Sequence, residues 1–99
     1  MDFKTYHDNL VKKLFDKAKS LDQDAKDELI PYLEKCIEFM KLDEQDIECD
    51  WASLKPLKNE QAISLFDCEL TDITIGCHYD YNDIIELDNQ LIDVLKGKE

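Results

Sequence analysis

Ninety-nine residues suffice for one hydrophobic core but not for two, so we expect residues 1–99 to form a single domain. A composition of 43% hydrophobic and 36% charged residues, with four phenylalanines, four tyrosines and one tryptophan, argues against a disordered chain. The net charge of −12 and the absence of arginine argue against direct nucleic-acid binding, because phosphates are bound by basic side chains.

Negative charge is concentrated in the second half of the chain. Residues 1–42 hold eight lysines and nine carboxylates, whereas residues 43–99 hold four lysines and fifteen carboxylates. Residues 59–95 contain nine carboxylates and no lysine or arginine, but many isoleucines and leucines are placed among the acids. A disordered acidic tail would lack those apolar residues. We therefore predict a folded acidic surface that attracts a strongly basic protein partner.

Two antiparallel helices are predicted for residues 3–42. Apolar residues recur every three or four positions in the first, at Phe3, Tyr6, Leu10, Leu14, Ala18 and Leu21. His7 falls on the same face, where we expect a packed imidazole satisfied by one hydrogen bond. A capping box formed by Ser20 and Gln23 is predicted to start the second helix. Pro31 is expected to kink or break that helix near residues 29–30.

A short third helix is predicted for residues 43–54. Its acidic start at residues 43–46 suits the positive end of a helix dipole, and Ile47, Trp51 and Leu54 follow at helical spacing. Trp51 has two interpretations. We favour a core plug between helices over an exposed binding anchor. The neighbouring acids Asp46, Glu48 and Asp50 support the second interpretation.

A helix is also predicted from an N-cap at Asn59 to about Thr71. The β-branched residues at 71 and 73–75 favour strands, so a hairpin over residues 63–79 is the alternative. We prefer the helix because the turn that such a hairpin needs contains no glycine. Gly76 is expected to end this segment.

The last predicted helix begins at Asp80 or Asn82 and ends before Gly97, which suits a left-handed C-cap. Its predicted buried stripe consists of Ile84, Leu87, Leu91 and Leu95. On the opposite face, an acidic ridge is formed by Asp83, Glu86, Gln90 and Asp93, which lie within about 80° of each other on a helical wheel. Asp88 lies at the margin of the apolar stripe, so we expect it to need a tyrosine, a lysine or a partner groove.

No catalytic residue, metal site or cofactor is predicted. Cys77 and His78 are adjacent in sequence, so their side chains do not face one another as a nucleophile and its base must. The four cysteines match no zinc or disulfide spacing, and the two glycines cannot form a phosphate-binding loop. Because neither a signal peptide nor a run of about 18 apolar residues is present, we expect a cytoplasmic protein without a membrane segment.

The predicted fold is a compact all-α bundle of four or five helices, with an α+β fold containing the 63–79 hairpin as the alternative. In size, charge and helical pattern the chain resembles the small acidic immunity proteins of bacterial toxin–immunity pairs, although no motif is shared. That resemblance implies a tight, non-catalytic complex in which acidic side chains block the substrate cleft of a toxin nuclease. The alternatives are a phage-encoded inhibitor that mimics nucleic acid and binds a host defence protein, or a small regulatory or adaptor subunit.

The residues that we predict to bind the basic partner are exposed acids of two segments and the single tryptophan. They are Asp46, Glu48, Asp50, Trp51, Asp80, Asp83, Glu86 and Asp93. No oligomeric state is predicted.

Overall fold

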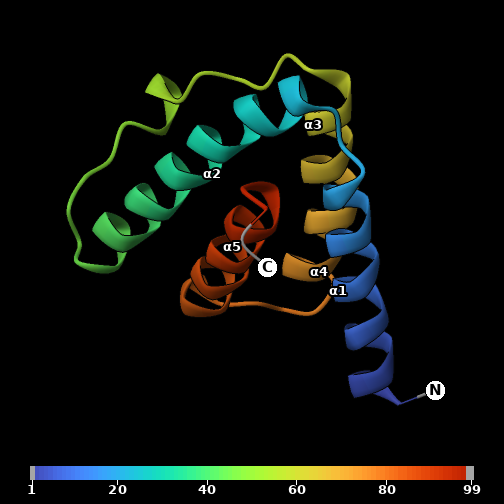
Figure 1. The fold of residues 1–99 in the computed structure, drawn as a ribbon. Helices are drawn as coiled ribbons and strands as arrows, with labels where there is room; N and C mark the ends of the chain where they lie inside the picture. Colours follow the sequence, from blue (N-terminus) through green and yellow to red (C-terminus); the bar gives the residue numbers. More distant parts are fainter. Residues whose placement is uncertain (1, 98–99) are drawn as a thin grey trace.

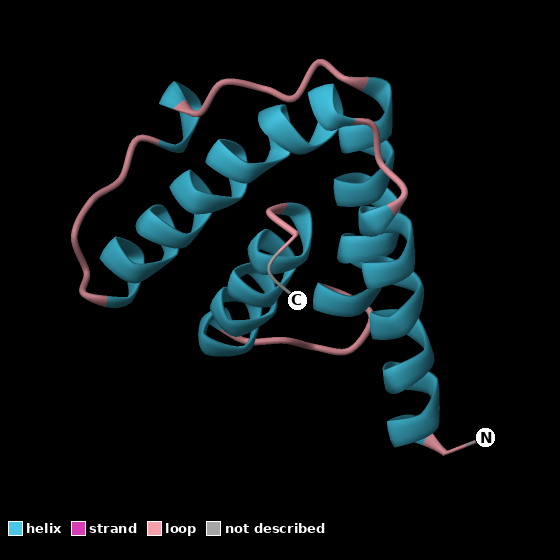
Figure 2. Cartoon of the chain, in the orientation of Figure 1, coloured by secondary structure: helices cyan, strands magenta, loops and turns pink. Residues whose placement is uncertain are grey.

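Five α-helices account for most of residues 2–97, the part of the chain that the computed structural model describes. They are α1 (Phe3–Lys19), α2 (Gln23–Glu44), α3 (Glu60–Ser64), α4 (Thr71–Thr74) and α5 (Tyr81–Leu95), with a 3-10 turn at Trp51–Ser53 and a π-helical segment at Leu65–Leu70. α5 lies between α1 and α2 and packs on both (Figure 1). No strand occurs in the described residues (Figure 2), so the all-α prediction is confirmed.

The junction between α1 and α2 differs from the predicted capping box. Ser20 ends α1 instead of starting α2, and its hydroxyl donates to the Lys17 carbonyl at 2.8 Å. Asp22 is the N-cap of α2, but its side chain makes no capping bond. The carboxylate of Asp22 instead accepts from the Gln61 amide at 3.1 Å, and its backbone N–H donates to Gln61 Oε1 at 2.9 Å. The Asp22 carboxylate and N–H are therefore bound by Gln61 of α3, whereas the Asp22 carbonyl accepts from Lys26 of α2.

Helix α2 continues through Pro31, so the predicted break does not occur. A proline in a helix removes one backbone hydrogen bond and crowds the preceding turn. Here Leu29 and Leu33, on either side of the proline, are both fully buried. Burial of two leucines is worth about 3–6 kcal/mol, which matches or exceeds the cost of roughly 3 kcal/mol for the proline.

The predicted third helix over residues 43–54 does not form. Residues 43 and 44 extend α2, and Asp46 then adopts a left-handed backbone with φ of 59°. Only the 3-10 turn at Trp51–Ser53 is helical in the stretch that follows, which runs along the outside of α2 toward α3 (Figure 1). A stripe of three apolar residues offers little area to bury. Packing therefore does not offset the free-energy cost of helix nucleation in this segment.

The segment from residue 60 to residue 74 is helical throughout, and the alternative hairpin is absent. Asn59 caps it as predicted, because its side chain accepts from the N–H groups of Gln61 and Ala62. The β-branched Ile73 is fully buried, so core packing outweighs its preference for strands. Gly76 follows the end of α4, where an added Cβ would lie 2.3 Å from the Asp72 carbonyl oxygen. Only glycine fits this close approach.

The fully buried leucines and isoleucine of the core come from α1, α2, the π-helical segment, α4 and α5. They are Leu14, Leu29, Leu33, Leu65, Ile73 and Leu91. The first turns of α1 extend beyond this core (Figure 1), so Phe3 and Tyr6 are exposed although they continue the apolar stripe. Lys17 connects α1 to the π-helical segment, since its ammonium donates to the Glu69 carboxylate at 3.0 Å and to the Ser64 hydroxyl at 3.1 Å.

Helix α5 has the predicted ends. Asp80 and Asp83 form a capping box, and Gly97 adopts a φ of 75° just after the last turn. Of the predicted stripe, Leu87, Leu91 and Leu95 are buried and Ile84 is half-buried. No helix among residues 2–97 combines the length and the apolar character that crossing a bilayer requires.

Asp88 is buried in the core instead of lying at its margin. Its side chain is 2% exposed, and Oδ1 has no hydrogen-bond partner among the described residues. The predicted tyrosine or lysine partner is therefore wrong. Cys36 of α2 is a titratable neighbour, and burial together with the charge of Asp88 raises the pKa of its thiol to about 11. Burial raises the pKa of Asp88 itself to about 7.

Candidate binding surfaces

The Trp51 loop, defined as residues 45–59, presents an aromatic side chain to solvent. Trp51 is 42% exposed, so the core-plug interpretation is wrong. One edge of its ring contacts Phe39 of α2, with ring centres 5.1 Å apart and planes at 75°. The Cys49 thiol donates to the backbone carbonyls of Phe39 and Ile47 at 3.4 Å. These contacts hold the indole in place while much of it remains open to solvent.

The three carboxylates that precede Trp51 form no ion pair within residues 2–97. They belong to Asp46, Glu48 and Asp50, which are all exposed. The other end of the loop is fastened to α2 by Glu28, whose carboxylate accepts from the backbone N–H groups of Lys58 at 3.0 Å and Asn59 at 2.7 Å. The loop is thus irregular in secondary structure but attached at both its middle and its end.

The acidic ridge on α5 lies on a different side of α2 from the Trp51 loop. Cys36 and Leu33 are on the buried side of α2, the side against which α5 packs, whereas Phe39 and Glu28 hold the loop on another face. Figure 1 shows the loop outside α2 and α5 inside it. The eight predicted binding residues therefore form two surfaces and not one.

The two surfaces approach each other at one end of the molecule. α5 runs antiparallel to α2, so its first turn lies near the end of α2. A hydrogen bond to the Asp43 carboxylate, followed by burial and the charges of Asp43, Cys49 and Glu44, raises the pKa of the Tyr81 hydroxyl. Asp80 and Asp83 belong to this end. Asp93 is about 15 Å further along α5, at 1.5 Å per residue.

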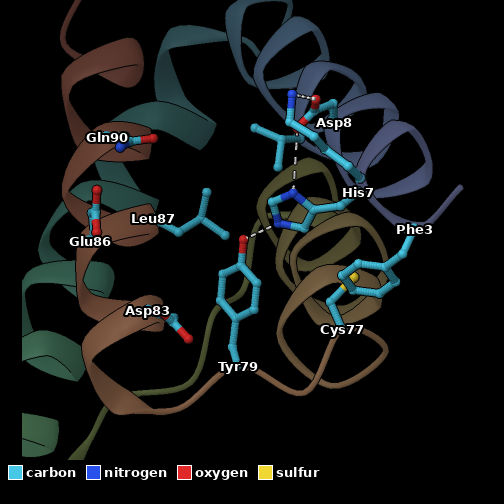
Figure 3. A pocket seen from close by; sticks show the side chains of 11 residues that line it. Phe3, His7, Asp8, Cys77, Tyr79, Asp83, Glu86, Leu87 and Gln90 are labelled. Carbon is cyan, nitrogen blue, oxygen red and sulfur yellow. Dashed lines mark hydrogen bonds and ion pairs between the residues drawn. The ribbon is translucent and has the colours of Figure 1, made fainter.

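A cleft of about 600 Å³ separates the acidic ridge from the first turns of α1. One wall carries Asp83, Glu86 and Gln90 of α5, and the opposite wall carries residues of α1 that include Phe3 and His7 (Figure 3). Asp93, the remaining member of the ridge, does not line the cleft. The ridge is therefore partly a free helix face and partly the wall of a cavity.

The floor of the cleft joins residues that are far apart in sequence. His7 Nε2 and the Tyr79 hydroxyl share a hydrogen bond, and the His7 ring stacks on Phe3 with ring centres 6.3 Å apart and planes at 21° (Figure 3). The expectation that His7 is a packed imidazole with a hydrogen bond is confirmed. Burial, together with the nearby Cys77, Asp83 and Glu86, raises the pKa of the Tyr79 hydroxyl above its ordinary value.

The sequence alone does not predict this cleft, because the hydrogen bond at its floor joins His7 to Tyr79, 72 positions away. Of the neighbouring Cys77, His78 and Tyr79, the sequence suggests chemistry only for the thiol and the imidazole. In the structure Cys77 is buried, and His78 is exposed with a left-handed φ of 56°. The tyrosine is the member that meets α1.

Residues 2–97 contain no group of three histidine, cysteine, aspartate or glutamate side chains arranged to hold a metal ion. The four cysteines are free thiols. Comparison of the chain with protein-family models, curated proteins and solved structures gives no match.

Proposed function

We propose that this chain is a non-catalytic acidic binding protein that neutralises a basic protein partner, as an immunity protein does when it blocks its cognate toxin nuclease. The observation that carries the proposal is the exposure of Trp51 among three unpaired carboxylates. Binding energy in protein interfaces is concentrated on a few residues, among which tryptophan is strongly enriched. A ring of charge around such an anchor adds orientation and a fast encounter.

The form of the Trp51 loop supports a binding role. Fifteen residues separate α2 from α3, and loops longer than about 12–15 residues without regular structure are usually functional. The contacts with Phe39 and Glu28 fix this loop on a rigid helix before any partner arrives. A surface that is already ordered loses less conformational entropy on binding, so more of the contact energy contributes to affinity.

The distribution of charge along the loop restricts where a basic partner can bind. Asp46, Glu48 and Asp50 precede Trp51 within the loop, whereas Lys55 and Lys58 lie toward α3 beside a groove of about 510 Å³. A basic surface would be repelled by those lysines. We therefore place the contact on residues 46–51 and the adjoining end of α2.

The test is capture of bacterial proteins on the immobilised chain at low salt, elution at high salt, and measurement of nuclease activity in the eluate. We expect a basic protein whose nuclease activity falls to zero when an equimolar amount of free chain is added back. Trp51→Ala should weaken capture at least tenfold, the effect of losing about 1.4 kcal/mol. Tyr6→Ala is the matched control, because Tyr6 is an aromatic residue of similar exposure on α1.

A captured partner that is not basic and stays bound at high salt would contradict the proposal. The same holds if Trp51→Ala and Tyr6→Ala capture the partner equally well. Capture of a basic partner that is not a nuclease would support the acidic binding function but contradict the toxin–immunity interpretation. A host nucleic-acid-binding protein as the partner would indicate the phage-inhibitor alternative.

A small regulatory or adaptor subunit is the second candidate, and one observation favours it. Ile75 is 70% exposed in the turn after α4, outside both acidic surfaces. An apolar contact there would be insensitive to salt. Retention of the partner at high salt by the parent chain and its loss in Ile75→Asp would support this candidate over the first.

A further inference from the structure

We propose that the cleft between α1 and α5 receives the guanidinium group of an arginine side chain. The proposal rests on the proposed function only in assigning that arginine to the basic partner. It adds a second, separate contact to the one at Trp51, on the other side of α2. The cleft itself can be tested with a small probe.

The charges that line the cleft leave two carboxylates without a cation. On the α1 side, the Asp8 carboxylate lies 3.9 Å from the Lys4 ammonium and 3.6 Å from His7 Nδ1. Asp83 accepts only a long bond, 3.4 Å, from the Asp80 backbone N–H, and Glu86 has no described hydrogen-bond or ion-pair partner. The α5 wall therefore offers acceptor oxygens that the protein does not use.

The α1 wall supplies a planar aromatic surface opposite those carboxylates. Phe3 is 63% exposed although it is an apolar residue at the start of a helix, and it stacks nearly parallel to His7. The Tyr79 hydroxyl fixes the orientation of the imidazole. Figure 3 shows Asp83 and Glu86 on α5 and the rings of Phe3 and His7 on α1, with the Leu87 and Tyr79 side chains drawn between them.

A guanidinium group matches this combination better than an ammonium group does. It is planar, weakly hydrated and able to stack on an aromatic face while its edge donates to carboxylates. An ammonium group is compact and strongly hydrated, and it has no flat face. The Gln90 amide, on the same wall as Glu86, supplies a further acceptor oxygen. The arrangement of rings on one side and acceptors on the other thus selects arginine over lysine.

The experiment is a titration of the isotope-labelled chain, followed by nuclear magnetic resonance, with three blocked amino acids. These are N-acetyl-arginine methylamide, its lysine analogue and its neutral isostere citrulline. We expect the arginine probe to shift the resonances of His7, Tyr79 and Gln90. The lysine probe should bind several-fold more weakly, and citrulline should give no shift at these residues.

Two variants of one helix provide the matched comparison. Glu86→Gln removes a carboxylate of the cleft wall, and Asp93→Asn removes an equally exposed carboxylate outside it. We expect Glu86→Gln to weaken arginine binding about five- to tenfold, as is typical for loss of a charge-assisted hydrogen bond, and Asp93→Asn to leave it unchanged. Phe3→Ala should weaken the arginine probe while leaving the charge of the cleft intact.

Equal binding of arginine and citrulline, or an equal effect of both carboxylate variants, would overturn the proposal. So would shifts confined to residues outside the cleft. These results are independent of partner capture. A chain that captures its basic partner through Trp51 but gives no shift at His7 and Tyr79 retains the proposed function without the arginine site. A chain that shows shifts at His7 and Tyr79 but captures no basic partner would support the arginine site and contradict the proposed function.

Discussion

Replacement of Asp88 by asparagine should stabilise the protein, and the gain should depend on pH. Asp88 is 2% exposed and one of its oxygens has no described partner, so the charged form is disfavoured in the folded state. Its folded pKa is about 7, against an ordinary value of 3.8. In the unfolded chain the carboxylate is solvated and titrates normally.

The direction in which stability changes with pH follows from proton binding to Asp88. Between pH 4 and pH 7 the folded protein holds a proton on Asp88 that the unfolded chain has released, so stability falls as pH rises through this range. Below about pH 4 both states are protonated, and above about pH 7 both are charged. A shift of about three pKa units, at 1.36 kcal/mol per unit, limits the loss of folding stability across this range to roughly 4 kcal/mol. This is a large part of the roughly 5–15 kcal/mol typical of a domain.

The measurement is urea unfolding of the parent and Asp88→Asn at a series of pH values, followed by far-ultraviolet circular dichroism. Because the other carboxylates titrate in both proteins, the difference between the two isolates residue 88. We expect similar stabilities near pH 4 and a gap of about 2–4 kcal/mol in favour of the variant by pH 8. A gap that stays constant with pH would mean that Asp88 is not buried as a lone carboxyl group.

Three further predictions concern the core, a turn and the acidic ridge. Leu91→Ala should cost about 2–5 kcal/mol in urea unfolding because Leu91 is fully buried, and a loss under 1 kcal/mol would contradict the packing of α5. Gly76→Ala should lower the melting temperature, since its Cβ would lie 2.3 Å from a backbone oxygen; an unchanged value would contradict that close approach. Reversal of Asp93 to lysine, on the part of the ridge outside the cleft, should slow association with the basic partner at low salt while dissociation changes little, as surface-plasmon-resonance kinetics would reveal. Unchanged association would mean that the ridge does not steer encounter.

The parts of the fold that could be predicted from the sequence are those with both a periodic apolar stripe and a local cap. α5 is the best example, since Asp80 and Gly97 mark its ends and its leucines recur at helical spacing. The helix after Asn59 was predictable for the same reason. The apolar stripe and the cap both depend on residues close together in sequence and need no tertiary contacts.

The predictions that the structure contradicts share a different cause. Ser20 could cap α2 by its sequence, but Gln61 of α3 takes over the polar groups of Asp22. The stripe from Ile47 to Leu54 has helical spacing, yet Ile47 and Trp51 stay exposed and only Leu54 packs, in part, against the core. Asp88 appeared marginal because helical angle alone does not report how deeply α5 inserts between its neighbours. Each outcome depends on a residue distant in sequence, as does the pairing of His7 with Tyr79 that forms the cleft.

The insertion of α5 between α1 and α2 has a consequence for how the chain acquires its structure. Helix α2, which carries the fully buried Leu29 and Leu33, packs on α5, roughly fifty residues later in the sequence. Contacts of such long separation slow folding, because a large loop must close before they form. During synthesis, α1 and α2 therefore leave the ribosome with their apolar faces open, and folding completes only when α5 follows them. For this interval the nascent chain exposes the surface on which chaperones act.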